Sequence, residues 1–296
     1  MKKPLFYIVL LSIIIGSCTK EIVIVPPNYQ EKLVVHSYLN SDSFVQVSVS
    51  KSLPISSKES FQAVTNAVIN IYEGGLLRGT LVHIIDGTYE IGFKPIKGKE
   101  YFIEVVAGDL RCTALDVVPD EVEIETIKVD TIPFFKGQDF LQFTLTPSND
   151  LGLKDYYEIS ALFKVREYVV TMGVLDSFDV LRKVNLSTID PIILSNTNND
   201  NFVNQFLFED EKMSAGTKIK VGTYDVKNLE PNLTPVSITL ILKKMSFLGY
   251  DYFNTLYNHN YYRSDPFSLP VKVHTNIENG YGFFGGTQED RIEIVF

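Results

Sequence analysis

The stretch Val45-Gln46-Val47-Ser48-Val49-Ser50 alternates valine with a polar residue. A repeat of two places the valines on one face of an extended chain and the polar side chains on the other, so the stretch predicts a half-buried β-strand. Similar runs lie between residues 33 and 119, and turn sequences such as Asp86-Gly87 and Gly108-Asp109 separate them. Short strands at this spacing predict an antiparallel β-sandwich over residues 33–119.

Residues 120–296 continue the strand-like pattern and change period once, near the C-terminus. Further strand-like runs occupy residues 122–129, 140–146, 156–170, 216–223 and 236–242. Aromatic residues then recur every three or four positions, which predicts one amphipathic helix over about residues 246–262 with Ser246 as its N-cap. We expect a glycine- and aromatic-rich loop over residues 278–286 and a short terminal strand to follow. The chain is therefore predicted to be all-β and mainly antiparallel, with a second β-rich domain over residues 120–296.

The N-terminus has the layout of an export signal. Lys2 and Lys3 precede an apolar stretch from Leu5 to Ile15, and Gly16-Ser17-Cys18 follows it. The apolar stretch is shorter than the roughly 20 residues that a membrane-spanning helix needs. The order predicts a signal peptide over residues 1–17 that is removed, and the small-small-Cys ending predicts that Cys18 then carries lipid. The alternative is an ordinary signal peptide with a chance cysteine.

Residues 18–32 are predicted to form a tether between this lipid and the folded chain. Pro26-Pro27-Asn28 favours an extended, solvated backbone there. A lipid on Cys18 would hold the protein on a membrane without spanning it.

Composition excludes several classes of protein. The formal charge is −9, whereas binding a nucleic acid backbone needs a concentrated basic surface, so we expect no nucleic acid partner. Apolar residues make up 45% of the chain, which is enough for a core and argues against disorder. With Cys18 lipidated, Cys112 has no partner for a disulfide, and we expect it to be a small buried apolar residue.

Four stretches of the chain resemble the Bacteroidota lipoprotein family known as domain of unknown function 4249. They are Lys32-Leu33-Val34-Val35-His36-Ser37-Tyr38-Leu39, the series from Ala67-Val68-Ile69-Asn70-Ile71 through Asp86-Gly87-Thr88-Tyr89 to Gly98-Lys99-Glu100-Tyr101, Phe208-Glu209-Asp210-Glu211, and Asn276-Ile277-Glu278-Asn279-Gly280-Tyr281-Gly282-Phe283-Phe284-Gly285. Asn279 stands where the family typically has a glycine, a mild departure because asparagine also tolerates positive φ.

The resemblance covers the mature chain and implies an immunoglobulin- or transthyretin-like N-terminal sandwich. It also implies an accessory partner of a TonB-dependent outer-membrane transporter. Lys20-Glu21 resembles a signal for export to the cell surface, so we expect the protein on the outer membrane, facing the cell surface rather than the periplasm.

Motifs for catalysis, metal binding or cofactor binding are weak. Gly280-x-Gly282-x-x-Gly285 matches a dinucleotide-binding pattern, but too little chain follows it for the helix and the distal acid that such a site needs. The four histidines have no zinc-binding spacing, and His36 and His83 are expected to be strand residues. Glu209-Asp210-Glu211 lacks the calcium-loop register and is expected to be a solvated loop. No serine hydrolase motif or glycosidase carboxylate pair is recognisable. We therefore expect no cofactor, no metal and no enzymatic activity.

Aromatic residues near the C-terminus are the strongest candidates for a recognition surface, because tyrosine and phenylalanine supply large contact areas at low entropic cost. The candidate partner- or ligand-binding residues are Tyr250, Phe253, Tyr257, Tyr261, Tyr281, Phe283 and Phe284. Core packing alone explains about half of such a cluster, because one face of a helix must be buried. The sequence therefore favours a non-enzymatic interaction protein that assists a transporter. The alternative is a stand-alone surface module that binds a glycan or a protein.

Overall fold

The computed structural model describes residues 29–54, 57–58, 61–133, 139–148, 154–171, 174–194, 203–224, 226, 229–263, 265 and 267–296. The predicted signal peptide, Cys18 and most of the predicted tether lie outside the described residues. No helix in these ranges is both long enough and apolar enough to cross a membrane.

The N-terminal part of the chain folds into a β-sandwich. Its strands are β1 (Leu33–Leu39), β2 (Val45–Lys51), β3 (Val68–Glu73), β4 (Leu76–Thr80), β5 (Val82–Ile85), β6 (Thr88–Ile91), β7 (Glu100–Ala107) and β8 (Leu110–Val117). Strands β1, β2, β6 and β5 lie in one sheet, and β8, β7, β3 and β4 lie in the other. The alternating valines of β2 face a buried core between the two sheets, which also contains Cys112. The predicted all-β fold and the buried Cys112 are confirmed.

The second part of the chain supplies longer strands and the helices. They are β9 (Ile124–Pro133), β10 (Asp139–Pro147), β11 (Tyr156–Thr171), β12 (Val174–Lys183), α2 (Pro191–Leu194), β13 (Gln205–Glu209), the 3-10 turn η2 (Asp210–Lys212), β14 (Ile219–Thr223), β15 (Leu233–Met245), α3 (Phe247–Tyr262), β16 (Ile277–Glu278) and β17 (Tyr281–Val295). Strands β14, β10 and β9 form a small sheet, and β16 extends the sheet of β8. A second core lies between the small sheet and strands β11 and β15.

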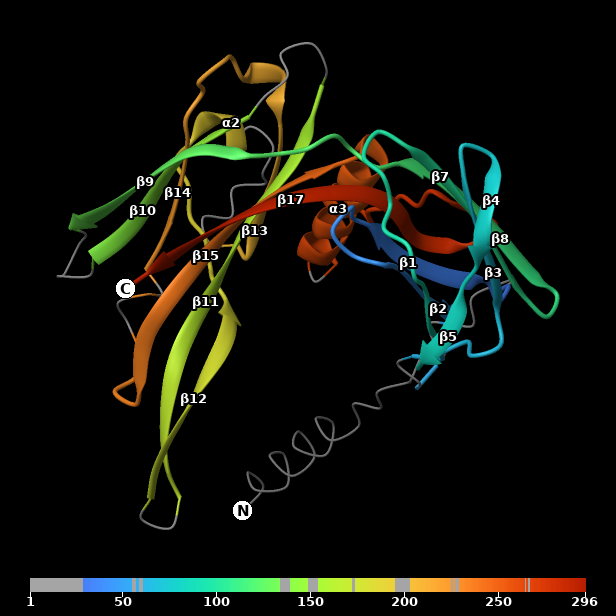
Figure 1. Cartoon of the computed structure of the whole chain (residues 1–296), viewed down its shortest axis with the longest axis horizontal. Coiled ribbons are helices and arrows are strands. Elements are labelled where there is room, and N and C mark those ends of the chain that lie inside the picture. Colours follow the sequence, from blue (N-terminus) through green and yellow to red (C-terminus); the bar gives the residue numbers. More distant parts are fainter. Residues whose placement is uncertain are drawn as a thin grey trace, which may run out of the picture.

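Strand β17 joins the two parts into one nine-stranded sheet (Figure 1). Its first half runs parallel to β1, with Val34 opposite Tyr281 and Leu39 opposite Gly286. Its second half runs antiparallel to β15, from Met245 opposite Thr287 to Ser237 opposite Val295. The C-terminal strand therefore completes the N-terminal sandwich as well as the second β-rich part.

The predicted loop over residues 278–286 is wrong, because most of this segment is the start of β17. The glycines there permit close approach to the neighbouring strand. Gly282 has φ +102°, and a Cβ at this position would stand 2.1 Å from the carbonyl oxygen of Val35. Sequence-based rules read glycine as a turn signal, whereas here it allows two backbones to pair tightly.

Helix α3 begins and ends where the sequence predicts. The side chain of its N-cap, Ser246, accepts a hydrogen bond of 3.1 Å from the backbone N–H of Gly249. The helix lies beside β17, where that strand passes from the N-terminal sandwich to the second part (Figure 1). It thus covers the junction between the two cores.

Candidate functional site

The structure separates the predicted recognition residues into core and surface. Phe283 and Phe284 are completely buried on opposite faces of β17. Phe284 belongs to the core of the N-terminal sandwich, whereas the ring of Phe283 stacks on that of Tyr252 in α3, with centroids 5.4 Å apart. Tyr250 is 9% exposed and packs in a small cluster with Met245. The prediction that Phe283 and Phe284 contact a partner is therefore wrong, because their side chains support the fold instead.

The remaining candidates do not form one continuous site. Tyr261 is exposed near the C-terminal end of α3, and its ring lies 6.3 Å from that of Tyr257. Tyr281 is exposed at the start of β17, where the amine of Lys32 lies 5.2 Å from its ring centroid. Phe253 is half-buried, and its ring lies 6.0 Å from that of Tyr38 near the end of β1. Of the predicted residues, Phe253 alone lines a pocket described below.

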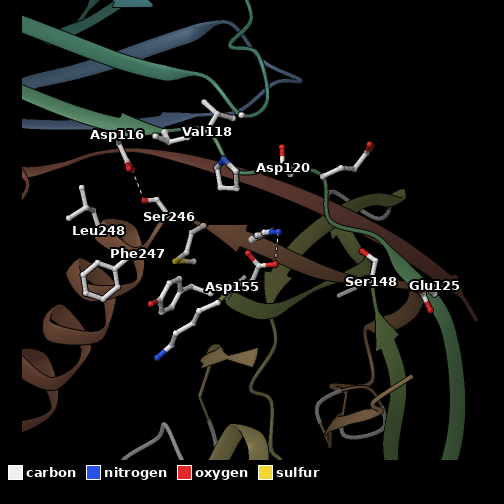
Figure 2. Close-up of a pocket in the computed structure, with 17 residues that line it drawn as sticks. Asp116, Val118, Asp120, Glu125, Ser148, Asp155, Ser246, Phe247 and Leu248 are labelled. Carbon is white, nitrogen blue, oxygen red and sulfur yellow. Dashed lines mark hydrogen bonds and ion pairs between the residues drawn. The ribbon is translucent and has the colours of Figure 1, made fainter. Parts of the chain in front are cut away.

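A large cleft lies beside the N-terminus of α3, at the junction of the two parts (Figure 2). Its volume is about 910 Å³. One wall is the segment that follows β8, including Val118 and Asp120, and the other walls are the start of β11 and the first turn of α3 with Phe247. The junction thus leaves a hollow of mixed polar and apolar lining between two well-packed cores.

Asp116 links three elements at the edge of this cleft. Its Oδ2 accepts a hydrogen bond of 2.5 Å from the Ser246 hydroxyl and one of 3.1 Å from the backbone N–H of Gly286. Burial raises the pKa of the Asp116 carboxyl to about 6, although these two donors oppose that rise. Because its donors are a helix cap and a strand backbone, Asp116 positions α3 against β8 and β17.

An ion pair between Lys244 and Asp155 lines the cleft. The amine of Lys244 lies 2.6 Å from the Asp155 carboxylate, and the Tyr157 hydroxyl donates to the same carboxylate at 3.3 Å. Asp210, from the predicted acidic loop, accepts from the backbone N–H of Asp155 at 2.9 Å. Asp210 is buried, so the prediction of a solvated loop is wrong at this residue.

No group of three or more metal-ligating side chains suitable for an ion occurs in the described part of the chain.

A second, smaller hollow lies on the sheet next to α3, and we call it the Tyr38 pocket. Its volume is about 250 Å³. The lining residues are Tyr38, Glu158, Ser160, Ala161, Leu162, Lys183, Asn204, Gln205, Ile241, Lys243 and Phe253. The rings of Tyr38 and Phe253 lie nearly parallel, at 9°, with centroids 6.0 Å apart. The pocket therefore combines an aromatic wall with polar side chains from β11, β13 and β15.

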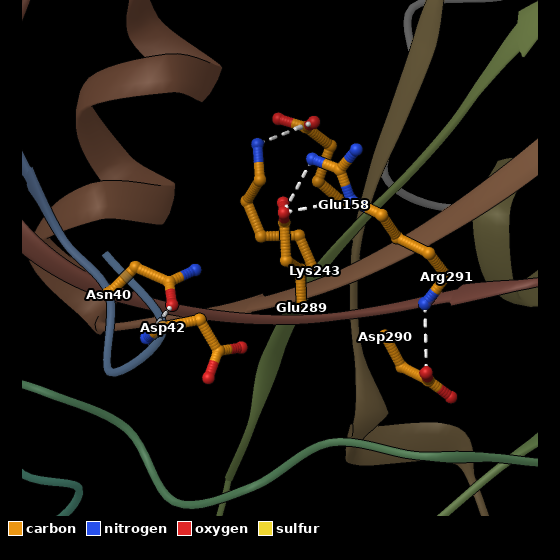
Figure 3. Close-up of polar contacts among 7 residues, drawn as sticks. All are labelled: Asn40, Asp42, Glu158, Lys243, Glu289, Asp290 and Arg291. Atoms are coloured by element: carbon orange, nitrogen blue, oxygen red, sulfur yellow. Dashed lines mark hydrogen bonds and ion pairs between the residues drawn. The ribbon is translucent and has the colours of Figure 1, made fainter.

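A partly buried ion pair, Glu158–Lys243, lines the polar side of the Tyr38 pocket, and Figure 3 shows this pair. The amine of Lys243 donates to Glu158 Oε1 at 3.1 Å, and the Glu158 side chain is 8% exposed. Nearby on the sheet, Arg291 donates to Glu289 at 2.6 Å. Burial, followed by the charges of Tyr252 and Glu158, raises the pKa of Tyr38 to about 12, so its hydroxyl stays protonated at neutral pH.

Tyr38, Glu158 and Lys243 are not among the residues that the sequence predicts to bind a partner or ligand. Glu158 lies in the otherwise apolar run Tyr156-Tyr157-Glu158-Ile159. Lys243 directly follows an apolar strand segment that ends at Leu242. Charged residues are rarely buried without a partner, so a charge within a strand expected to be buried is a usable signal. The partner of such a charge, however, can be identified only once β11 and β15 are known to pair.

Comparisons with known proteins identify one family. A family model described as "Domain of unknown function (DUF4249)" matches residues 19–293. No curated protein matches the chain. One solved structure, Bacteroides uniformis beta-glucuronidase 2 covalently bound to cyclophellitol-6-carboxylate aziridine, matches with 8% sequence identity and a TM-score of 0.17. That match covers 69% of this chain and 30% of the other, and its TM-score is too low to indicate a shared fold.

Proposed function

Since the chain belongs to the DUF4249 family, we propose that it is a non-enzymatic outer-membrane lipoprotein that assists a TonB-dependent transporter in capturing or admitting its substrate. Cys18 carries the lipid in this proposal, and the folded part faces the cell surface. Residues 29–32 contact the folded part, for example through Lys32 and Ser52, so the tether is left with residues 18–28, which span at most about 40 Å when fully extended. A transporter in the same membrane is therefore within reach of the folded part.

The observation that carries this proposal is a hairpin with an exposed edge strand, which we call the arm: Leu162–Thr171 of β11 paired with Val174–Lys183 of β12. Beyond Glu167, β11 no longer pairs with β15, and this tip of the arm projects away from both cores (Figure 1), whereas Phe163 and Val165 at the base of the arm are buried in the second core. Val174 and Phe178 are exposed on one face of β12, and Leu175 and Leu181 are exposed on the other. Strand β12 is also an edge of the nine-stranded sheet. Exposed apolar side chains on an unpaired strand edge are typical of a surface that contacts another protein.

Affinity purification from detergent-solubilised membranes tests the proposal. We expect the full-length tagged chain to retain an outer-membrane TonB-dependent transporter, identified by mass spectrometry. The variant L175T/F178T/L181T should retain at least about tenfold less of it, because a few central apolar residues usually dominate an interface. Ile189→Thr is the matched control, since Ile189 is 82% exposed and lies outside the arm. Failure of the wild-type chain to retain any such transporter would sink the proposal.

The attachment of lipid is tested separately. We expect cells that express the wild-type chain to incorporate labelled palmitate into it and to keep it in the membrane fraction. Cys18→Ser should abolish the label and release the protein from the membrane, because the thiol is the acylation site. Labelling of the Cys18→Ser chain to the same extent as wild type would contradict the assignment.

The second candidate function is a stand-alone module that binds a glycan or a protein at the cell surface. The Tyr38 pocket favours it, because a concave site with an aromatic wall and polar groups is suited to a small ligand. The two functions are distinguished by whether binding persists when no transporter is present.

A further inference from the structure

We propose that the Tyr38 pocket binds one pyranose ring of a carbohydrate. This site is separate from the arm and does not depend on a transporter, so either proposal can fail without the other. The volume of about 250 Å³ lies below the range of roughly 300–1,000 Å³ that is typical of pockets for drug-sized ligands. A single sugar ring fits that size, whereas a dinucleotide or a folded peptide does not.

The aromatic wall supplies the apolar half of the recognition. Tyr38 is 49% exposed, although burial of this ring would be favourable. Its ring is held in place by Phe253, at 6.0 Å, and by Phe283, at 5.8 Å. A pyranose presents a face of C–H groups that packs on the electron-rich face of such a ring. A fixed aromatic ring loses little entropy when a sugar stacks on it.

The polar side supplies the directional half. Glu158 offers two oxygens with about four lone-pair positions, and Lys243 offers three N–H donors. Their mutual contact at 3.1 Å uses one donor and one acceptor. The pair leaves further donors and acceptors side by side in the pocket, which matches the hydroxyl groups of a sugar. Ser160, Asn204 and Gln205 add neutral groups that can both donate and accept hydrogen bonds.

The Glu158–Lys243 pair is partly buried, with 8% of the Glu158 side chain and 23% of the Lys243 side chain exposed. A buried ion pair contributes little net stability, and apolar residues of similar volume often stabilise a protein equally well or better. The pair lies on the sheet face next to Tyr38 rather than within either large core. Other ligand classes fit less well. For a cation, the pocket offers one carboxylate, Glu158, which is already paired with the amine of Lys243. A wholly apolar ligand would remove water from this ion pair without forming hydrogen bonds with it.

The test measures binding of sugars to the full-length protein in a detergent without a sugar headgroup. Saturation-transfer NMR is recorded with methyl glycosides of glucose, galactose, mannose and N-acetylglucosamine, and with glucuronate. We expect saturable binding of at least one of these. Tyr38→Ala should weaken it at least about tenfold, because stacking area is lost, whereas Tyr38→Phe should retain most of the affinity.

Tyr168→Ala is the matched control, because Tyr168 is an exposed tyrosine on the arm, outside the pocket. It should bind sugars as the wild-type protein does. Absence of saturable binding for every sugar would overturn the proposal. Equal affinities of wild type and Tyr38→Ala would also overturn it, as would binding of acetate as strongly as any sugar, since that would report only attraction of an anion to lysine.

Discussion

At the scale of single residues, Asp116 makes the free energy of unfolding depend on pH. The pKa of its carboxyl is about 6 in the folded protein, above its usual value of 3.8. The folded state therefore holds a proton more tightly than the unfolded chain, and the contribution to stability is greatest at low pH and is lost as pH rises through about 6. The loss is about 3 kcal/mol, because the pKa differs between 3.8 and about 6 and one pKa unit corresponds to about 1.4 kcal/mol.

Asp116→Asn should remove this pH-dependent contribution to the free energy of unfolding. The amide oxygen of asparagine can still accept from Ser246 and Gly286, so the fold should persist. We expect the stability of the wild type relative to the variant to fall between pH 4 and pH 7, measured by urea unfolding at a series of pH values. A difference that stays constant over that interval would show that Asp116 does not titrate there.

Gly282 is the residue at which β17 depends most on the absence of a side chain. It combines φ +102° with a backbone oxygen of Val35 that a Cβ would meet at 2.1 Å. Gly282→Ala should destabilise the protein by roughly 2–4 kcal/mol, since strain and a steric clash add. Gly92→Ala is the control, because a Cβ at Gly92 meets nothing within 4 Å. Equal unfolding midpoints of the two variants in urea would contradict this role.

The sequence predicts the role of a residue best when the contacts of that residue lie close to it in the chain. Ser246 was predictable as an N-cap, because a capping side chain and the N–H that it satisfies lie within three residues. The same residue also donates to Asp116, which is far away in sequence, and no local pattern indicates that contact. Tyr38 and Glu158 were missed for the same reason, since their meeting depends on strands β1 and β11 being placed in one sheet.

At the scale of elements, the exposed apolar side chains of β12 differ from Phe163 and Val165 at the base of the arm, which belong to the second core. The three side chains Leu175, Phe178 and Leu181 are between 50% and 65% exposed. We therefore expect L175T/F178T/L181T to change the free energy of unfolding by less than about 1 kcal/mol, because threonine suits a strand and little buried area is lost. Urea unfolding of the purified variant measures this. A loss of several kcal/mol would mean that these three side chains pack on the protein itself.

Regular strands and the helix were predictable because periodicity reports directly which face is buried. Strand β2 alternates throughout, and α3 follows the recurrence of its aromatic residues. The start of β17 was mistaken for a loop because its glycines, which resemble turn signals, are required by close pairing with β1. The alternation of apolar and polar residues that identifies a strand is absent where both faces of the strand are buried. Glycines that allow close backbone contact also weaken the pattern.

At the scale of the whole molecule, β17 makes the two halves interdependent. It contributes Phe284 to the N-terminal core and packs Ile292 and Ile294 against the second core. Heating or urea should therefore unfold the chain in one cooperative transition, with coincident signals from both halves. Removal of residues 281–296 should prevent stable folding of either half, as measured by circular dichroism and limited proteolysis. A stable N-terminal sandwich in that truncated chain would contradict this interdependence.

The central claim is that the arm docks the protein on an outer-membrane transporter. Photo-crosslinking in living cells tests it most directly, with a photoreactive phenylalanine analogue placed at Phe178 of the arm and, as the control, at Ile189. Both positions are exposed, so reactivity alone does not separate them. We predict a crosslink from position 178 to a TonB-dependent outer-membrane transporter and none from position 189. Absence of that crosslink at position 178, or equal crosslinking at both positions, would contradict the claim.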